Sequence, residues 1–380
     1  MQLPSNPSMR IRAAVLNEPK QPFVIEELEL DPPRAGEVLI KLAACGVCHS
    51  DWHVATGDTR HPMPVVTGHE GAGVVEAVGD GVDDVKVGNH VVLSWAPFCG
   101  KCFYCLRDKP NLCDTYTAPI WAGTMLDGTT RLSRTRDGKR EPVYSYCGTA
   151  SFATHTVVPR ASCVVVRKEK EIKLDRVALI GCAVATGVGA AMYTAHVRPG
   201  DVVVVFGLGG VGLSIVQGAR LCAASQIITV DAEPKKRFVP QHFGATSFLL
   251  NSDDVVAAVM DHTEGRGADH VFEAIGIPKV QEQALACVRP GGTLTLAGLA
   301  PMGSTTNFPS AVIARKEITI KGSYYGSVNA QRDFPMLVDL YTSGRLDLDA
   351  MVTKRYSLDQ INEAFAAMMR GELSRGVIIL

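Results

Sequence analysis

The sequence predicts an α/β protein in two parts, a mostly β region followed by a doubly wound parallel sheet. Short Val-rich runs separated by Gly, Pro and Asp occupy residues 9–95, as in strands joined by turns. From Gly200 onward, apolar strand-like runs alternate with helix-like segments, which is the pattern of a parallel sheet with helices on both faces. The length of 380 residues fits two domains.

The first region contains four predicted strands and several less regular segments. The predicted strands are residues 12–16, 36–43, 71–78 and 89–93. Residues 115–142 are rich in Thr, Arg, Gly and Asp without a clear period, so we predict a long surface loop there. Strand character returns at 151–168, and 174–183 is predicted to be a buried helix. Residues 1–8 are predicted to be a loose tail.

The second region begins with a strong strand–helix–strand signal. Residues 202–206 and 227–230 are apolar strand-like runs, and 213–222 between them is predicted to be helical. Further strands are predicted at 270–274, 293–297 and 318–321. The C-terminal part has predicted helices at 334–343 and 358–369 and a short strand at 376–380, and it is predicted to return to the first domain.

Composition limits the partners and the compartment of the protein. The formal net charge is −1, which gives no electrostatic reason to expect a nucleic acid or an anionic membrane as a partner. No signal peptide and no membrane-spanning stretch are recognised, so we expect a cytoplasmic protein. The eleven cysteines are then expected to be metal ligands and small buried side chains, without disulfides.

Four cysteines in one short stretch predict a closed metal site. Cys99, Cys102, Cys105 and Cys113 are separated by two, two and seven residues, which no helix or strand period requires. Four thiolates can converge on one tetrahedral zinc ion. The alternatives are scattered core cysteines or a pair of disulfides, for which this spacing is poorly suited. We therefore predict a structural zinc site that takes no part in catalysis.

Two further clusters place thiols, imidazoles and carboxylates where strands prefer apolar side chains. The two runs are Cys45-Gly46-Val47-Cys48-His49-Ser50-Asp51-Trp52-His53 and Gly68-His69-Glu70-Gly71. By itself, the pair Cys45 and Cys48 is compatible with a redox pair, half of a zinc site, or neither. A lone histidine such as His69 is usually only a hydrogen-bonded side chain.

A glycine-rich turn predicts a dinucleotide site in the second region. Gly207, Gly209 and Gly212 match Gly-x-Gly-x-x-Gly between a predicted strand and a predicted helix, and Asp231 follows nineteen residues after the last glycine. The turn and the helix N-terminus can hold a pyrophosphate. A carboxylate at Asp231 can bind the adenosine ribose and repels a 2′-phosphate, which favours NAD over NADP. The whole run is Gly207, Leu208, Gly209, Gly210, Val211 and Gly212.

Taken together, these motifs resemble the zinc-dependent alcohol dehydrogenases of the medium-chain dehydrogenase/reductase superfamily. The resemblance runs from about residue 12 to residue 380 and is closest to the long-loop, dimeric branches. It rests on five motifs in this order: Cys48-His49-Ser50-Asp51, Gly68-His69-Glu70, the Cys99–Cys113 cluster, Gly181-Cys182 and the glycine run. It implies two zinc ions per subunit, one catalytic and one structural, together with NAD.

The resemblance also implies roles for individual residues. Cys48, His69 and Cys182 match the ligands of the catalytic zinc, which polarises the alcohol while hydride passes to the nicotinamide. Asp51 and Glu70 match positions that support these ligands. The matched proton-relay positions are Ser50 and His53. The matched coenzyme contacts are His49 and Arg375 (pyrophosphate), Lys236 (ribose) and Thr186 (nicotinamide), beside Gly207, Gly209, Gly210, Val211, Gly212 and Asp231.

Domain roles, assembly and substrate are expectations of the same kind. Residues 9–183 and 325–380 would form a discontinuous GroES-like catalytic domain, and 184–324 an NAD-binding Rossmann domain. A homodimer is expected from the long loop. Trp95 and Ser50 match pocket positions and suggest aliphatic or aromatic alcohols, including secondary ones. The alternatives are a formaldehyde dehydrogenase dependent on mycothiol or glutathione, a zinc-free quinone-type reductase, and a non-catalytic zinc- and NAD-binding redox sensor.

Overall fold

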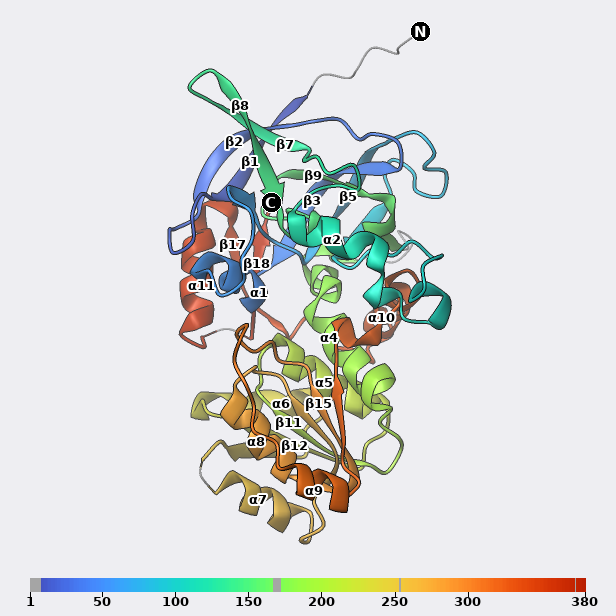
Figure 1. Ribbon diagram of the computed structural model, residues 1–380, viewed down its shortest axis with the longest axis vertical. Helices are drawn as coiled ribbons and strands as arrows, with labels where there is room; N and C mark the ends of the chain where they lie inside the picture. The colour runs from blue at the N-terminus through green and yellow to red at the C-terminus, as the bar shows by residue number, and fades with distance from the viewer. Residues whose placement is uncertain (1–7, 167–171, 253, 373) are drawn as a thin grey trace. The chain divides into compact units, whose positions relative to one another are not determined.

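The structure is a computed structural model that describes residues 8–166, 172–252, 254–372 and 374–380. The chain divides into two compact units, one of Met1–Cys182 with Asn329–Leu380 and the other of Ala183–Val328 (Figure 1). The tail predicted at residues 1–8 lies outside the described residues except for Ser8, and so does the end of the strand region predicted at 151–168.

The first unit contains a closed barrel of five strands. Their order is β1 (Met9–Leu16), β2 (Val24–Leu30), β7 (Leu132–Arg136), β8 (Lys139–Ser145) and β4 (Val65–Val66). β1 pairs antiparallel with β2, and its four C-terminal residues, from Ala13 to Leu16, are fully buried. The predicted strand at 12–16 is thereby confirmed and begins three residues earlier.

The prediction of a long surface loop at residues 115–142 is wrong. This segment folds into helix α2 (Asp114–Ala122) and most of the β7–β8 hairpin, whose strands close the barrel (Figure 1). The strands could not be predicted from a hydrophobic pattern, because their polar side chains form ion pairs and hydrogen bonds with other polar groups. Arg134, for example, donates to Glu26 and Glu141 at 2.8 and 2.7 Å.

A second sheet carries the functional motifs of the first unit. Its strands are, in order, β10 (Cys163–Val166), β6 (His90–Leu93), β5 (Gly71–Val78), β3 (Glu37–Gly46), β18 (Arg375–Ile379) and β17 (Val352–Ser357), with β9 (His155–Pro159) on β3. The remaining predicted strands of this unit are confirmed within its described residues.

Strand register brings segments far apart in sequence to one end of this sheet. β3 and β5 are antiparallel neighbours, and Cys45 is opposite Gly71. β18 pairs with the other side of β3, where Val377 is opposite Gly46. The end of β3 and the beginnings of β5 and β18 therefore lie together, which sets the residues flanking these strands side by side.

The described part of the first unit also contains five α-helices. They are α1 (His49–Thr56), α2, α3 (Leu174–Val177), α10 (Ala330–Thr342) and α11 (Ile361–Met369). The buried helix predicted at 174–183 is interrupted, since α3 passes into a 3-10 turn at Ala178–Gly181. Cys182 then has φ −145° and ψ −77°, outside the helical region, before α4 begins. The break therefore takes the backbone of Cys182 out of helical geometry.

The second unit is a parallel six-stranded sheet with helices on both faces, as predicted. The strand order is β13 (Ser247–Leu250), β12 (Gln226–Asp231), β11 (Val202–Phe206), β14 (Ala268–Glu273), β15 (Val288–Leu296) and β16 (Thr319–Gly322). The order reverses beside β11, which is where doubly wound sheets bind dinucleotides. The helices are α4 (Ala183–Gly189), α5 (Gly210–Leu221), α6 (Val239–Phe243), α7 (Val255–His262), α8 (Pro278–Ala286) and α9 (Ser310–Arg315).

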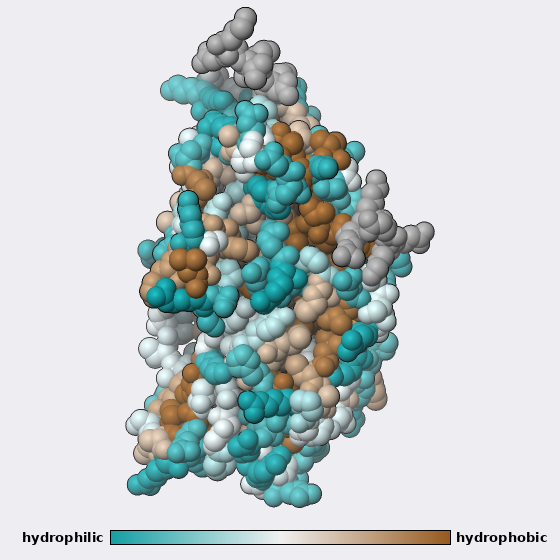
Figure 2. Space-filling model, turned by 90° about the vertical axis from the view of Figure 1, so that its right-hand side faces the viewer, coloured by the Kyte–Doolittle hydropathy of each residue, from teal (hydrophilic) through white to brown (hydrophobic). Residues whose placement is uncertain are grey.

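Within the described ranges, no single helix is long and apolar enough to cross a membrane. One bent pair, Leu174–Gly181 with Ala183–Ala195, meets the length and composition criteria only when both parts are taken together. On the face shown in Figure 2, apolar side chains form separate patches among polar ones.

Candidate active site and metal centres

Four side chains that could bind a metal ion converge at the end of the second sheet. Cys48 directly precedes α1, His69 and Glu70 directly precede β5, and Cys182 occupies the helix break. One ligand atom from each of them lies within 4.8 Å of the others. Two thiols, an imidazole and a carboxylate form a donor set that suits Zn²⁺, so the residues fit the predicted metal.

Asp51 fixes the orientation of His69. The Asp51 Oδ1 atom lies 3.0 Å from His69 Nδ1 and also accepts a hydrogen bond of 2.8 Å from the backbone N–H of Gly68. A carboxylate only accepts, so Nδ1 carries the proton and Nε2 keeps its lone pair for a metal. Both side chains are almost fully buried, at 0% and 2% exposure, so water does not compete for this contact.

Glu70 is held by a cation from a distant part of the chain. Arg375, at the start of β18, donates to Glu70 Oε2 across 305 positions of sequence. Gly46 makes room for this pair, because a Cβ there would collide with the same carboxylate oxygen. Arg375 is only 6% exposed, so it is not a solvated surface charge, and its predicted contact with a pyrophosphate stays a prediction.

The electrostatics of the cluster favour a thiolate at Cys48. A hydrogen bond from Cys182 and the nearby charge of His69 lower the pKa of Cys48 well below its usual value, although burial opposes this shift. The hydrogen bond with Cys48, together with burial, raises the pKa of Cys182. Zinc binds cysteine as the thiolate, so the site already favours the charge state that one of its ligands needs.

Helix α1 carries the two predicted relay residues. Ser50 Oγ lies 3.8 Å from Cys48 Sγ. His53 is one turn further on, with its side chain 26% exposed, and its Nδ1 lies 3.4 Å from Asp58 Oδ2. Residues three apart share one face of a helix, so both groups point to the same side of α1.

An aromatic side chain that sequence reasoning missed borders the metal ligands. The Tyr146 ring contacts the His69 ring edge to face, with centroids 5.7 Å apart. It also contacts His61 at 5.5 Å and Trp121, on α2, at 6.3 Å. Tyr146 is buried, so it forms an apolar wall beside the imidazole. The sequence around Tyr146 has no clear hydrophobic period and no recognised motif, so its position beside His69 could not be predicted.

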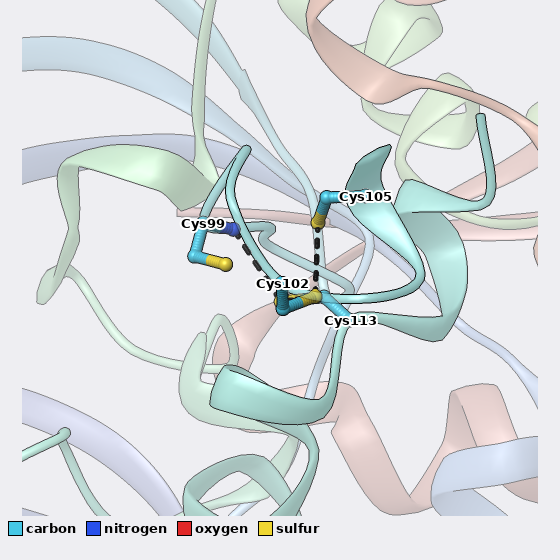
Figure 3. Close-up of side chains that lie close together, drawn as sticks. All are labelled: Cys99, Cys102, Cys105 and Cys113. Atoms are coloured by element: carbon cyan, nitrogen blue, oxygen red, sulfur yellow. Dashed lines mark hydrogen bonds between the residues drawn. The ribbon is translucent and has the colours of Figure 1, made fainter. Parts of the chain in front are cut away.

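The second cysteine cluster gathers four sulfur atoms around one centre (Figure 3). Cys102 Sγ lies 3.4 Å from Cys105 Sγ and 3.8 Å from Cys113 Sγ, and all four sulfurs lie within 4.8 Å of one another. Thiolates around a tetrahedral zinc ion are about 3.8 Å apart, so the residues fit this metal as well. The hydroxyl of Thr115 donates to Cys99 and lowers the pKa of that thiol to about 6.

The glycine run forms a tight turn between β11 and α5. Gly207 has φ +91°, which favours glycine, and Gly209 is the N-terminal cap of α5, followed by Gly210 and Val211 in its first turn. A Cβ on Gly212 would collide with the carbonyl oxygen of Gly207, whereas one on Gly209 would meet nothing within 4 Å. The turn therefore leaves open space in front of a helix N-terminus, which fits a pyrophosphate group.

The predicted ribose contacts lie beside this turn. Asp231 Oδ2 accepts a hydrogen bond of 2.8 Å from the backbone N–H of Leu208 and another of 3.0 Å from Lys236 Nζ. The structure thus joins the end of β12 to the turn through one carboxylate. Of the other predicted contacts, Thr186 is buried on α4 in this unit, and His49 is exposed at the start of α1 in the first unit.

Comparison with known proteins agrees with these motifs. Residues 34–168 match the family model described as alcohol dehydrogenase GroES-like domain, and 210–343 match zinc-binding dehydrogenase. An NDMA-dependent alcohol dehydrogenase from Amycolatopsis methanolica is 42% identical over 98% of this chain and 99% of its own. An S-(hydroxymethyl)glutathione dehydrogenase from Paracoccus denitrificans is 39% identical over 98% and 100%.

A solved structure of similar sequence shows the same fold throughout. Benzyl alcohol dehydrogenase from Acinetobacter calcoaceticus superposes with a TM-score of 0.91 at 31% identity, over 98% of this chain and 99% of that one. The α/β fold with a GroES-like part and a Rossmann part is therefore confirmed. The chain belongs to the NAD-dependent, zinc-binding alcohol dehydrogenases of the medium-chain dehydrogenase/reductase superfamily, as its motifs predict.

Proposed function

We propose that this protein interconverts alcohols and aldehydes or ketones with NAD, and that Cys48, His69 and Cys182 hold the catalytic zinc. The observation that carries this proposal is the ion pair between Glu70 and Arg375. The pair engages the only carboxylate of the cluster, which leaves three protein ligands. Three ligands and an open position are the arrangement of a catalytic zinc site, whereas four closed ligands are that of a structural one.

The residues of this chain orient the alcohol and remove its proton. Zinc at this site would polarise the alcohol oxygen, and NAD would accept the hydride. Ser50 Oγ, which lies close to Cys48, would accept the hydroxyl proton. His53, partly exposed on the same face of α1, would pass it to water. Asp51 would keep His69 in the tautomer that binds metal.

The domain roles follow from where these groups lie. We assign catalysis to residues 9–183 and 325–380 and coenzyme binding to 184–324, and the division of the chain into two compact units supports this. Asp231, Lys236, Thr186 and the glycine run would bind NAD in the second unit, and His49 and Arg375 are the further pyrophosphate contacts that the family resemblance implies. The carboxylate of Asp231 disfavours the 2′-phosphate of NADP.

We further infer a cytoplasmic homodimer that binds neither nucleic acid nor membrane. All eleven cysteines are free, which suits a reducing compartment. The outer edge of β16 has no partner strand within the described part of the second unit. Helix α9 nearby has no buried residue although most of its side chains are apolar. A second copy covering this edge would protect both features.

A thiol-dependent formaldehyde dehydrogenase is the second candidate. The relative from Paracoccus denitrificans carries the name S-(hydroxymethyl)glutathione dehydrogenase, and it matches this chain almost as well as the alcohol dehydrogenase from Amycolatopsis methanolica. The two functions share zinc, coenzyme and hydride transfer, so they differ only in the group that accompanies the reacting carbon.

The proposal is tested by counting zinc and measuring turnover on one sample. We expect two zinc ions per subunit, and NADH formation with some members of a panel of primary, secondary and benzylic alcohols. Cys48→Ser should lose one zinc ion and at least about 100-fold in kcat/KM. Cys105→Ser should lose the other zinc ion. The matched control is Cys45→Ala, a buried thiol next to the cluster that should keep both ions and the activity.

Three other outcomes would change the assignment. Formaldehyde oxidation that appears only after a thiol is added would favour the second candidate. Two zinc ions with tight NADH binding, but no turnover of any alcohol or aldehyde, would favour a non-catalytic redox sensor. A single zinc ion that is unaffected by Cys48→Ser would mean that the catalytic metal site is misassigned.

A further inference from the structure

Glu273 is a buried carboxylate that no part of the chemistry above uses. It is the last residue of β14 in the second unit, at the carboxyl edge of the parallel sheet, and it is 0% exposed. Among the residues that the structure describes, no cation forms an ion pair with it. Burying an unpaired charge is costly, and burial accordingly raises the pKa of Glu273. Such a group is retained only where hydrogen bonds hold it.

The hydrogen bonds of Glu273 all come from segments that form the edge of the sheet. Its Oε1 accepts bonds of 2.8 and 2.7 Å from the backbone N–H groups of Ile275 and Gly276. Its Oε2 accepts a bond of 3.3 Å from Gln281 Nε2 on α8. The side chain thus folds the loop after β14 back onto its own strand and attaches it to the following helix.

The backbone of the same residue holds the neighbouring loop. The carbonyl oxygen of Glu273 accepts hydrogen bonds of 2.8 Å from the N–H groups of Ala297 and Gly298, directly after β15. The two loops touch at Gly276 and Gly298, because a Cβ on Gly298 would collide with the backbone nitrogen of Gly276. One residue therefore sets the positions of both loops.

The first of these loops reaches the dinucleotide turn. A Cβ on Gly207 would collide with the side chain of Ile275, so Ile275 covers the first glycine of the turn. Ala274 N–H also donates to the carbonyl oxygen of Phe206, the residue before that glycine, at 2.9 Å. Ile275 nevertheless keeps 39% of its surface exposed, which leaves an apolar face at the edge where doubly wound sheets bind dinucleotides.

We propose that Glu273 is a positioning residue for the coenzyme, whose buried carboxylate holds the loops after β14 and β15 in the arrangement that binds NAD. This inference rests on the NAD-dependent function proposed above. Glu273 touches neither coenzyme nor substrate in this role and acts through Ile275 and the backbone of both loops. Its loss should therefore weaken coenzyme binding and leave the chemistry of the bound complex nearly unchanged.

The test is Glu273→Gln in the zinc-loaded, full-length protein. Glutamine keeps the size of the side chain but loses the charge, and it places an amide N–H₂ group where Gln281 also donates. Hydrogen bonds to a charged acceptor are stronger than those to a neutral one. We therefore expect the Kd for NADH to rise roughly tenfold. Fluorescence titration with NADH alone measures this. The KM for NAD should rise similarly, with kcat at saturating NAD within about threefold.

A pair of variants separates positioning from a general loss of structure. Glu273→Gln combined with Gln281→Glu reverses the contact between these two side chains and should recover most of the NADH affinity. Glu264→Gln, an exposed carboxylate in the same unit, is the matched control and should behave like the parent protein. Zinc content and melting temperature would be recorded for every variant.

Two results would overturn the inference. One is unchanged NADH affinity in Glu273→Gln. The other is a joint loss of melting temperature, kcat and NADH affinity that the double variant does not reverse, which would make the role merely structural. A parent protein that binds NADH but turns over no alcohol would refute the proposed function alone, since the NADH titration still tests Glu273.

Discussion

Asp51 shows how one buried side chain can control a metal ligand. It accepts from His69 and from the backbone of Gly68 in a site closed to water. Asp51→Asn keeps the shape but removes the charge that favours the Nδ1–H tautomer. We expect zinc affinity and kcat/KM to fall about 10- to 100-fold, measured by chelator competition and by initial rates.

Asp84→Asn provides the control for this change. Asp84 also pairs with a cation, Arg160, but its side chain is 68% exposed. An exposed ion pair contributes little, so zinc affinity and activity should stay at the parent level. Equal effects of the two substitutions would contradict a specific role for Asp51.

Cys163 gives the protein a pH dependence at alkaline pH. This thiol is fully buried, and burial raises its pKa to about 12 from a reference of 9.0. The stability that the neutral Cys163 thiol contributes is fully present below the pKa of this thiol in the unfolded chain. It is lost as the pH rises towards the pKa of the thiol in the folded protein. The free energy of unfolding should therefore fall by up to about 1.4 kcal/mol per pH unit above pH 9 from this group.

Denaturant unfolding at about pH 8 and pH 10 tests this expectation. Cys163→Ala lowers stability at both values through the cavity it leaves, but it removes the titrating group. The variant should therefore lose less stability between the two values than the parent protein does. An identical loss in both proteins would show that Cys163 does not titrate in this window.

At the scale of elements, the end of α2 depends on a glycine. Gly123 caps this helix with φ +69°, and a Cβ there would lie 2.7 Å from His61 Cε1 and 3.0 Å from Tyr144 Cβ. Gly128 has a similar φ of +74° but open space around it. Both Gly→Ala changes cost about 1 kcal/mol for the left-handed backbone, and Gly123→Ala costs about 1–3 kcal/mol more for the contacts.

The comparison of these two variants isolates the steric contribution. Thermal unfolding should show a larger loss of melting temperature in Gly123→Ala than in Gly128→Ala. Because α2 carries Trp121, which contacts Tyr146, the KM for alcohols should change only in Gly123→Ala. Equal melting temperatures would mean that His61 and Tyr144 move aside without cost.

Elements with a clear hydrophobic period could be predicted, and those built on polar contacts could not. The strand at 202–206 is apolar throughout and buried on both faces, so its pattern fixed both its type and its bounds. The β7–β8 hairpin carries many polar side chains, of which Arg134 pairs with Glu26 on β2 and Arg140 pairs with Asp31 just after β2. Only the folded barrel supplies those partners, so the segment resembles a loop in the sequence.

At the scale of the whole molecule, the sheet edge at β16 predicts the assembly. A homodimer should have a mass of about twice 40.7 kDa by light scattering. Val312 lies on the exposed α9, and Val312→Glu should weaken the dimer because a buried carboxylate would lack a partner there. Val87→Glu, an exposed apolar position in the first unit, is the control. A monomeric parent protein would refute this arrangement.

The sequence by itself determined the chemistry and the order of the motifs. Some motifs are local patterns, because residues close together in the sequence form them completely. Examples are the four thiols at short spacing, and the glycine turn between strand and helix with an acidic residue at the end of the next strand. The tertiary structure alone decided which distant groups meet. Glu70 and Arg375 are 305 positions apart, and strand pairing of β3 with β5 and β18 joins them. Pairing between remote segments depends on the packed core, which no local pattern encodes.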